Sequence, residues 1–330
     1  MSMRKPLVFI LLTLLTATSA FAAKFSGDAF SLGVGGRGLA LGGAVVAGPF
    51  DGTAAYWNPA GMNYLRGRYL TAMHAETFGS LLNQDFVAYV DANRKEEAVI
   101  SAFSFYIYYL GGGGIKITQL NQFNRPFVVR EESHGDWLFS AAVSGKVAGK
   151  IDLGATAKVI YRDIGTESGF GLTMDAGALY TANQYLRLGL MVTDITSGFI
   201  RYSGGTQLTD STGATFESTN HTEAIIPTVK PGLMLTYRYD DWTGRLVASG
   251  DIKFENLRTA AQYWTGSLSL DTHYGLEIGW REMLFGRTGF DIGRFTAGAG
   301  VDIRRFTIDF AYLHHDDLDE TYRVSAGYRF

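Results

Sequence analysis

Long stretches of the chain alternate between apolar and polar positions with a period of two residues. In the C-terminal stretch ETYRVSAGYRF, Tyr322, Val324 and Phe330 fall on one face, and Arg323 and Arg329 fall on the other. The same alternation recurs in residues 151–163, 169–180, 294–303 and 305–314. Period-two alternation over such lengths predicts β-strands that have one apolar and one polar face.

The number and spacing of these segments predict how the strands are arranged. We expect about 14 strands, an even number as bacterial outer-membrane barrels require, at 68–76, 85–93, 97–109, 137–147, 151–163, 169–180, 185–193, 226–239, 244–254, 268–280, 283–291, 294–303, 305–314 and 320–330. Short connections alternate with longer ones, and the two longest, 111–136 and 194–224, fall at the same end. This layout predicts an all-β, antiparallel transmembrane barrel with its long loops outside.

The polar faces of the strands separate a membrane barrel from a soluble sandwich. On the polar faces, charged side chains alternate with glycine along long strands. Soluble cores rarely have this pattern, whereas the water-filled lumen of a barrel does. The predicted lumen charges carry both signs, which favours mutual pairing over an ion-selective ring. They are Lys158, Arg162, Asp175, Arg187, Lys230, Arg238, Asp251, Lys253, Glu277 and Asp309.

The N-terminus has the three parts of a secretory signal peptide. Arg4 and Lys5 precede an apolar run from Leu7 to Leu15, and small residues follow up to the A-x-A sequence that ends at Ala22. The apolar run is shorter than a membrane-spanning helix requires. We therefore expect residues 1–23 to be removed, and we expect the exported chain to reside in the bacterial outer membrane, in contact with its lipid and lipopolysaccharide.

Residues 24–65 do not alternate and are rich in glycine. A wide barrel needs a plug unless it is an open channel, so we predict a hatch at 24–65 that closes a barrel formed by 66–330. Gly33, Gly35 and Gly38 match G-x-G-x-x-G, but the strand, helix and acidic residue of a dinucleotide-binding unit are missing around them. These glycines therefore do not predict a cofactor.

Other candidate chemistry is weak. Ser267, Ser269, Asp271 and His273 share a strand face, but neighbours two apart are too distant for contact between a nucleophile and its base. His314, His315, Asp316, Asp317, Asp319 and Glu320 form a polar cluster without diagnostic metal-ligand spacing. The chain has no cysteine and a net charge of −3, which excludes thiolate sites and argues against nucleic-acid binding. We expect neither an enzyme nor a bound cofactor or metal.

The stretch GRGLALGGAVVAGPFDGTAAYWNPAGM (36–62) resembles the hatch of FadL-type outer-membrane transporters, with the PorV/PorQ branch as the nearest likeness. The matching residues are Arg37, Gly42, Gly43, Ala44, Ala54, Trp57, Asn58, Pro59, Ala60 and Gly61. IIPTVKPGLMLTY (225–237) resembles the family's strand after its longest loop. Where the family often has two acidic residues in the hatch, only Asp51 remains.

The resemblance implies a channel for passive uptake of hydrophobic small molecules, such as long-chain fatty acids or aromatic compounds. Ligand would bind between hatch and wall and leave sideways through an opening in the wall. Phe25, Phe30, Phe50 and Tyr56 are candidates to line a ligand pocket, or they pack the plug without binding ligand. Tyr328 and Phe330 resemble the signal read by the barrel-assembly machinery. The alternative function is that of a PorV-like component of type IX secretion, which binds cargo or partner proteins.

Overall fold

The computed structural model describes residues 28–93, 99–165, 167–196, 198–204, 207–209, 215–217, 220–255, 257–315 and 319–330. The predicted signal peptide and Phe25 lie outside these described residues.

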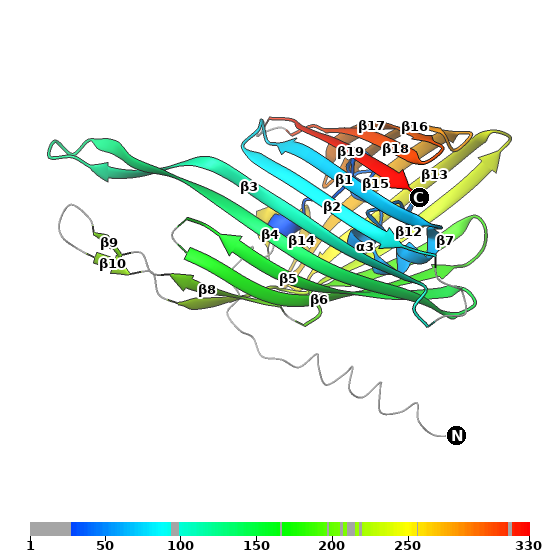
Figure 1. The fold of residues 1–330 in the computed structure, drawn as a ribbon, viewed down its shortest axis with the longest axis horizontal. Coiled ribbons are helices and arrows are strands. Elements are labelled where there is room, and N and C mark those ends of the chain that lie inside the picture. The colour runs from blue at the N-terminus through cyan, green and yellow to red at the C-terminus, as the bar shows by residue number, and fades with distance from the viewer. Residues whose placement is uncertain are drawn as a thin grey trace, which may run out of the picture.

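Within the described ranges, 14 antiparallel strands form a closed barrel, because β19 pairs back with β1 (Figure 1). The predicted fold class and strand number are confirmed. The strands are β1 (Arg68–Thr77), β2 (Leu82–Asp91), β3 (Ala102–Leu120), β4 (Pro126–Ala148), β5 (Ile151–Asp163), β6 (Glu167–Thr181), β7 (Leu186–Thr193), β12 (Thr228–Tyr239), β13 (Trp242–Lys253), β15 (Leu268–Trp280), β16 (Leu284–Asp291), β17 (Arg294–Ile303), β18 (Phe306–Leu313) and β19 (Thr321–Arg329).

The wall has an apolar outer face and a polar inner face, as the alternation predicts. On β6, Phe170, Leu172 and Met174 are about half exposed on the outside, whereas Thr173 and Asp175 are buried. Such a wall presents hydrocarbon to its surroundings and keeps its charged groups inside the barrel.

The region 111–136 differs from the expected loop. There β3 and β4 run on past the other strands as a two-stranded ribbon that turns between Leu120 and Pro126 (Figure 1). Residues of this ribbon are exposed on both faces, so no buried face imposes the alternation from which strands are read. The four glycines at 111–114 and a register shift between Gly112 and Ile115 hide the pattern further.

The expected loop 194–224 also contains strands. They are β8 (Phe199–Gly204), β9 (Gln207–Thr209), β10 (Thr215–Glu217) and β11 (His221–Ala224). β8 pairs with the start of β6 and with β11, and β9 pairs with β10. Between β13 and β15 lie the 3-10 helix η4 (Arg258–Ala260) and the short strand β14 (Tyr263–Thr265). These strands are too short to show a period.

Residues 28–65, which we call the N-terminal segment, lie inside the barrel. Their helical turns are η2 (Asp28–Phe30), α2 (Gly36–Ala40), α3 (Ala54–Trp57) and η3 (Pro59–Tyr64). α2 packs against β17 and β18, and η3 packs against β4 and β5, on the opposite side of the barrel. Among the described residues, no helix has the length and apolarity needed to cross a membrane. The segment thus bridges the lumen from wall to wall.

Candidate functional site

The Asn58-Pro59 turn is buried against the wall. The Asn58 side-chain amide donates to the carbonyl oxygens of Val46, at 2.9 Å, and of Ala178 on β6, at 3.3 Å. Its oxygen accepts from the backbone N–H of Ala60 at 3.1 Å, as a helix cap does. One fully buried side chain therefore joins two parts of the N-terminal segment to the barrel.

Glycines on the wall provide the room for this turn. A Cβ on Gly154 of β5 would lie within 3.0 Å of backbone atoms of Pro59 and Ala60, and a Cβ on Gly177 of β6 would lie equally close to Asn58 and Pro59. The turn and the wall are therefore complementary in shape, and neither glycine has space for a side chain.

The glycine-rich stretch packs against the indole ring of Trp57. A Cβ on Gly33 would come 2.8 Å from Cη2 of Trp57, and a Cβ on Gly38 would come 2.5 Å from its Cζ2. The indole N–H donates to the carbonyl oxygen of Val34 at 3.1 Å. The two halves of the motif thus pack on each other, which explains the apparent G-x-G-x-x-G without a phosphate.

A cluster of charges fixes α2 to the other side of the barrel. Arg37 donates from Nε and Nη2 to both carboxylate oxygens of Glu277 on β15, at 2.9 and 2.8 Å. Glu277 is fully buried and also accepts from Arg245 at 2.7 Å and from Arg287 at 2.6 Å. Arg287 donates further to Asp309 at 2.6 Å. Burial opposes the charge on Arg37, but the Glu277 carboxylate raises the pKa of Arg37 above its usual value.

A cavity of about 140 Å³ lies between the N-terminal segment and the wall. Its apolar lining combines rings and aliphatic groups of the segment, β3, β4, β5 and β7: Phe30, Tyr56, Trp57, Tyr106, Leu138, Ile160 and Met191. The volume is close to that of an engineered cavity, about 150 Å³, that binds benzene. We call this space the upper cavity. Burial raises the pKa of Tyr56, whose hydroxyl donates to the Phe30 carbonyl oxygen at 2.7 Å.

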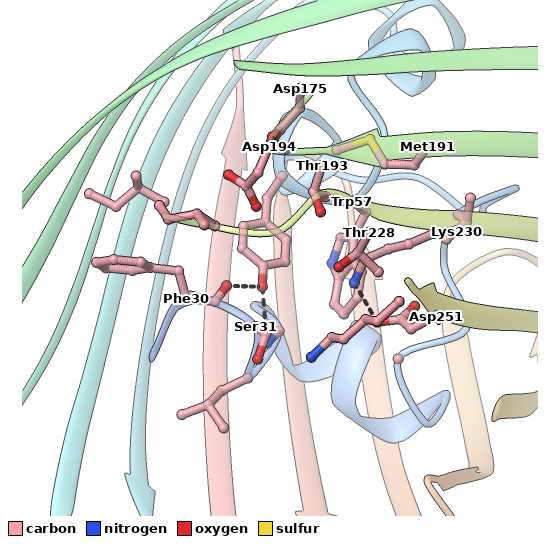
Figure 2. A pocket seen from close by; sticks show the side chains of 18 of the residues that line it. Phe30, Ser31, Trp57, Asp175, Met191, Thr193, Asp194, Thr228, Lys230 and Asp251 are labelled. Atoms are coloured by element: carbon pink, nitrogen blue, oxygen red, sulfur yellow. Dashed lines mark hydrogen bonds and ion pairs between the residues drawn. The ribbon is translucent and has the colours of Figure 1, made fainter. Parts of the chain in front are cut away.

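Ion pairs also line the upper cavity. Lys158 contacts Asp175 at 2.6 Å and Asp194 at 2.7 Å, and Lys230 contacts Asp251 at 2.5 Å. Figure 2 shows these aspartates and Lys230 facing the same space as Phe30 and Trp57. The cavity is therefore amphipathic, with most of its charges neutralised in pairs.

The wall beside the upper cavity has an interruption in its strand pairing. β6 pairs with β8 over Glu167–Leu172 and with β7 over Ala176–Thr181, so Thr173, Met174 and Asp175 have no ladder partner on this edge, although they pair with β5 on the other edge. The next strand along the wall is also broken at this level: β11 pairs with β8, β12 pairs with β7, and the residues between β11 and β12 have no ladder partner. We call this the wall interruption. Thr193, Asp194, Ile225 and Ile226 border it and line the cavity.

A second cavity, of about 520 Å³, lies on the other side of the N-terminal segment. Phe50, Asp51, Tyr64, Arg187 and Arg238 line it, together with the charge cluster around Arg287. The Arg187 guanidinium carbon lies 3.7 Å from the centre of the Tyr64 ring. We call this the lower cavity. It is the larger and more polar of the two.

The other candidate residues are distributed over both cavities. Phe30 and Tyr56 line the upper cavity, but Phe50 lines the lower one. Gly61 packs on Phe50, and Gly42 and Gly43 lie against β15 and β16. Asp51 accepts from Thr53 at 2.8 and 2.6 Å. Of the remaining lumen charges, Lys253 lines the upper cavity, and Arg162 binds Asp136 at 2.7 Å. Tyr328 and Phe330 stack at the end of β19, with ring centres 5.6 Å apart.

The weak catalytic and metal candidates stay apart. The Ser269 hydroxyl donates to the Glu255 carbonyl oxygen at 2.6 Å, while His273 lies 2.9 Å from Asp291. No group of three metal-binding side chains occurs among the residues that the structure describes. Asp316 and Asp317 of the polar cluster fall outside that part of the chain.

Several residues of the site were not singled out from the sequence. Arg245, Arg287 and Asp194 share ion pairs with predicted lumen charges. Arg323 lies on the predicted polar face of the last strand and lines the upper cavity. Strand parity places such residues inside a barrel, but it does not say which of them meet.

The fold is similar to that of two monoaromatic hydrocarbon channels and of a FadL homologue. CymD, a monoaromatic hydrocarbon channel, is 11% identical and matches over 91% of this chain and 98% of its own, with a TM-score of 0.57. A mutant of the TodX monoaromatic hydrocarbon channel gives 12% identity, 90% and 99% coverage, and a TM-score of 0.55. A FadL homologue from Pseudomonas aeruginosa is 14% identical and matches over 89% of this chain and 97% of its own, with a TM-score of 0.52. No protein-family model and no curated protein sequence matches the chain. At these low identities the likeness shows the fold alone, which is a closed barrel of the FadL and TodX type.

Proposed function

We propose that the chain is an outer-membrane channel for passive uptake of hydrophobic small molecules, fatty acid-like or aromatic. The N-terminal segment would act as its hatch. The observation that carries the proposal is the position of the upper cavity, which has the segment on one side and the wall interruption on the other. A molecule held in the upper cavity lies next to the barrel wall. An apolar solute that passes through the wall enters the membrane directly.

The polarity along the lumen supports a sideways exit. A molecule that continued straight through the barrel would pass the Asn58 turn, the Arg37–Glu277 cluster and then the polar lower cavity. Moving apolar surface out of water lowers the free energy by about 25 cal/mol per Å². The wall interruption therefore offers the favourable route, with Lys158 bridging Asp175 and Asp194 at its inner side. Two of the similar structures are named as monoaromatic hydrocarbon channels, which agrees with this class of ligand.

The test uses purified protein in lipid vesicles and a hydrophobic aromatic compound added outside. We expect wild-type protein to speed uptake, and we expect the variant with Asn58→Ala and Pro59→Ala to change both uptake and binding, because the hatch loses its anchor on β6. The exposed pair Arg281–Asp241, at 2.9 Å, offers a control: Asp241→Asn should leave uptake unchanged. Unchanged uptake and binding in the Asn58, Pro59 variant would exclude a gating hatch.

One observation favours the second candidate, a surface component that binds partner proteins in secretion. The β3–β4 ribbon extends beyond the barrel and exposes Phe123, Phe127 and Val129 at 72%, 47% and 47%. Shortening the ribbon from 113 to 133 separates the two functions. A channel keeps vesicle uptake without it, whereas a secretion component loses the export of its cargo.

A further inference from the structure

Arg323 lines the upper cavity and carries hydrogen-bond donors that have no partner. The residue is 1% exposed, and its Nη2 donates to the carbonyl oxygen of Leu32 at 3.1 Å and to Oε1 of Gln84 at 2.8 Å. Its Nε and Nη1 have no hydrogen-bond partner. Within the described ranges, no ion pair joins it to a carboxylate, unlike Lys158 and Lys230 in the same lining. A buried guanidinium without a counter-charge is costly, so an anionic group from a ligand would be stabilising there.

The position of Arg323 is fixed before any ligand binds. Gln84 accepts from Arg323 and donates to the carbonyl oxygen of Gly33 at 2.6 Å. Leu32, the other acceptor, also belongs to the N-terminal segment. These contacts hold the guanidinium between β2 and the segment, and a preorganised donor loses little entropy on binding.

One free donor of Arg323 and the indole of Trp57 lie beside the same glycine. A Cβ on Gly33 would lie 3.7 Å from Nη1 of Arg323 and 2.8 Å from Cη2 of Trp57, so both groups flank the same glycine. The Tyr56 hydroxyl accepts from the Gly33 N–H at 3.1 Å, and the Phe30 ring lies 5.5 Å from the Tyr108 ring. A cation and an aromatic wall are therefore next to each other in the upper cavity.

From this arrangement we infer that the upper cavity binds a monoaromatic carboxylate, with its carboxylate on Arg323 and its ring against Phe30, Tyr56 and Trp57. The guanidinium suits a planar carboxylate, and the cavity volume of about 140 Å³ suits one ring. The aspartates at 175, 194 and 251 are already paired with Lys158 and Lys230, and the single guanidinium of Arg323 balances one negative charge, which favours a monocarboxylate. This inference rests on the proposed channel function and narrows its ligand.

The experiment compares benzoate, methyl benzoate and toluene as probes of the detergent-purified full chain, with binding measured by calorimetry. For the wild type we expect benzoate to bind more tightly than its neutral ester. Arg323→Met should weaken benzoate about 10-fold or more, the size of a lost hydrogen bond to a charged group. The same variant should bind toluene as the wild type does.

Arg187→Met is the matched control, because Arg187 also has a buried Nε without a partner but lines only the lower cavity. It should leave benzoate affinity unchanged. Equal affinity of the wild type for benzoate and its ester overturns the inference even if Arg323→Met does not fold. Unchanged benzoate affinity in a folded Arg323→Met protein, or binding of oleate without benzoate, also overturns it. Toluene binding without a preference for the acid leaves the channel proposal standing, whereas binding of none of the probes counts against both.

Discussion

Arg37 and Glu277 form a two-point ion pair, although they are 240 residues apart in the sequence. Arg37 belongs to α2 and Glu277 to β15, so the pair ties the N-terminal segment to the barrel. The same buried carboxylate also binds Arg245 and Arg287. Arg245 donates further to Glu282, and although burial opposes ionisation, this hydrogen bond lowers the pKa of Glu282. One carboxylate is thus the shared partner of three guanidinium groups.

Glu277→Gln should lower the free energy of unfolding more than Arg37→Met. The first change leaves three buried cations around a neutral amide, and breaking a buried pair costs about 3–5 kcal/mol. The second change leaves Glu277 with two of its arginines. Denaturant unfolding in detergent measures both. The control is Asp241→Asn on the exposed Arg281 pair, for which a surface pair predicts a loss of about 1 kcal/mol or less. Equal losses in all three variants would contradict the central role of Glu277.

Gly154→Ala should displace the Asn58-Pro59 turn from the wall. Its methyl group would lie within 3.0 Å of the backbone of Pro59 and Ala60, which cannot yield as a flexible side chain does. We expect a cost of about 1–3 kcal/mol, typical of overpacking, and faster proteolysis of the N-terminal segment. Gly286→Ala adds the same methyl group to β16, where nothing lies within 4 Å. If both variants resist protease equally, the turn does not depend on the fit at Gly154.

Gly38→Ala should disturb the indole of Trp57, because the added Cβ would come 2.5 Å from the ring. The smaller ring of a Trp57→Phe change should relieve the clash, so the double variant should lose less stability than the two single losses combined. A double-mutant cycle with denaturant unfolding measures this coupling, which is about 0.5–3 kcal/mol for residues in contact. Strictly additive losses would show that the two halves of the motif do not depend on each other.

Much of the barrel was predictable because one face of each strand is apolar and the other is polar. The strands at 151–163, 268–280 and 294–303 have the predicted bounds. Strands cannot be predicted from alternation where that contrast is missing, as on the β3–β4 ribbon, where Phe123, Phe127 and Val129 are exposed. A strand with two similar environments carries no period.

The site was predictable only in part, for a different reason. Trp57 and Asn58 stand in a recognisable motif, and parity marks Glu277 and Lys158 as inward-facing. Which inward residues meet depends on strand order and stagger, which a single sequence does not contain. Arg323 shows this limit: its partners Leu32 and Gln84 are 291 and 239 residues away.

A bulky group at Ile225 should block passage from the upper cavity to the membrane. Ile225 is buried, lines that cavity, and donates its N–H to the Gly198 carbonyl oxygen at 2.6 Å across the wall interruption. Because the natural chain has no cysteine, Ile225→Cys introduces a single labelling site. Before labelling, the variant should take up an aromatic solute into vesicles as the wild type does, since the new side chain is smaller and apolar. Labelling with a large thiol reagent should then reduce uptake several-fold.

The matched control is Leu190→Cys, which places the label on the outer face of β7, where the side chain is 45% exposed. The same reagent should leave its uptake unchanged, because this label lies outside the route. If label at Ile225 leaves uptake intact while the label is shown by mass to be attached, the solute does not leave through the wall interruption. The upper cavity would then have to empty through the lower one, past the Arg37–Glu277 cluster, and the segment rather than the wall would be the moving part.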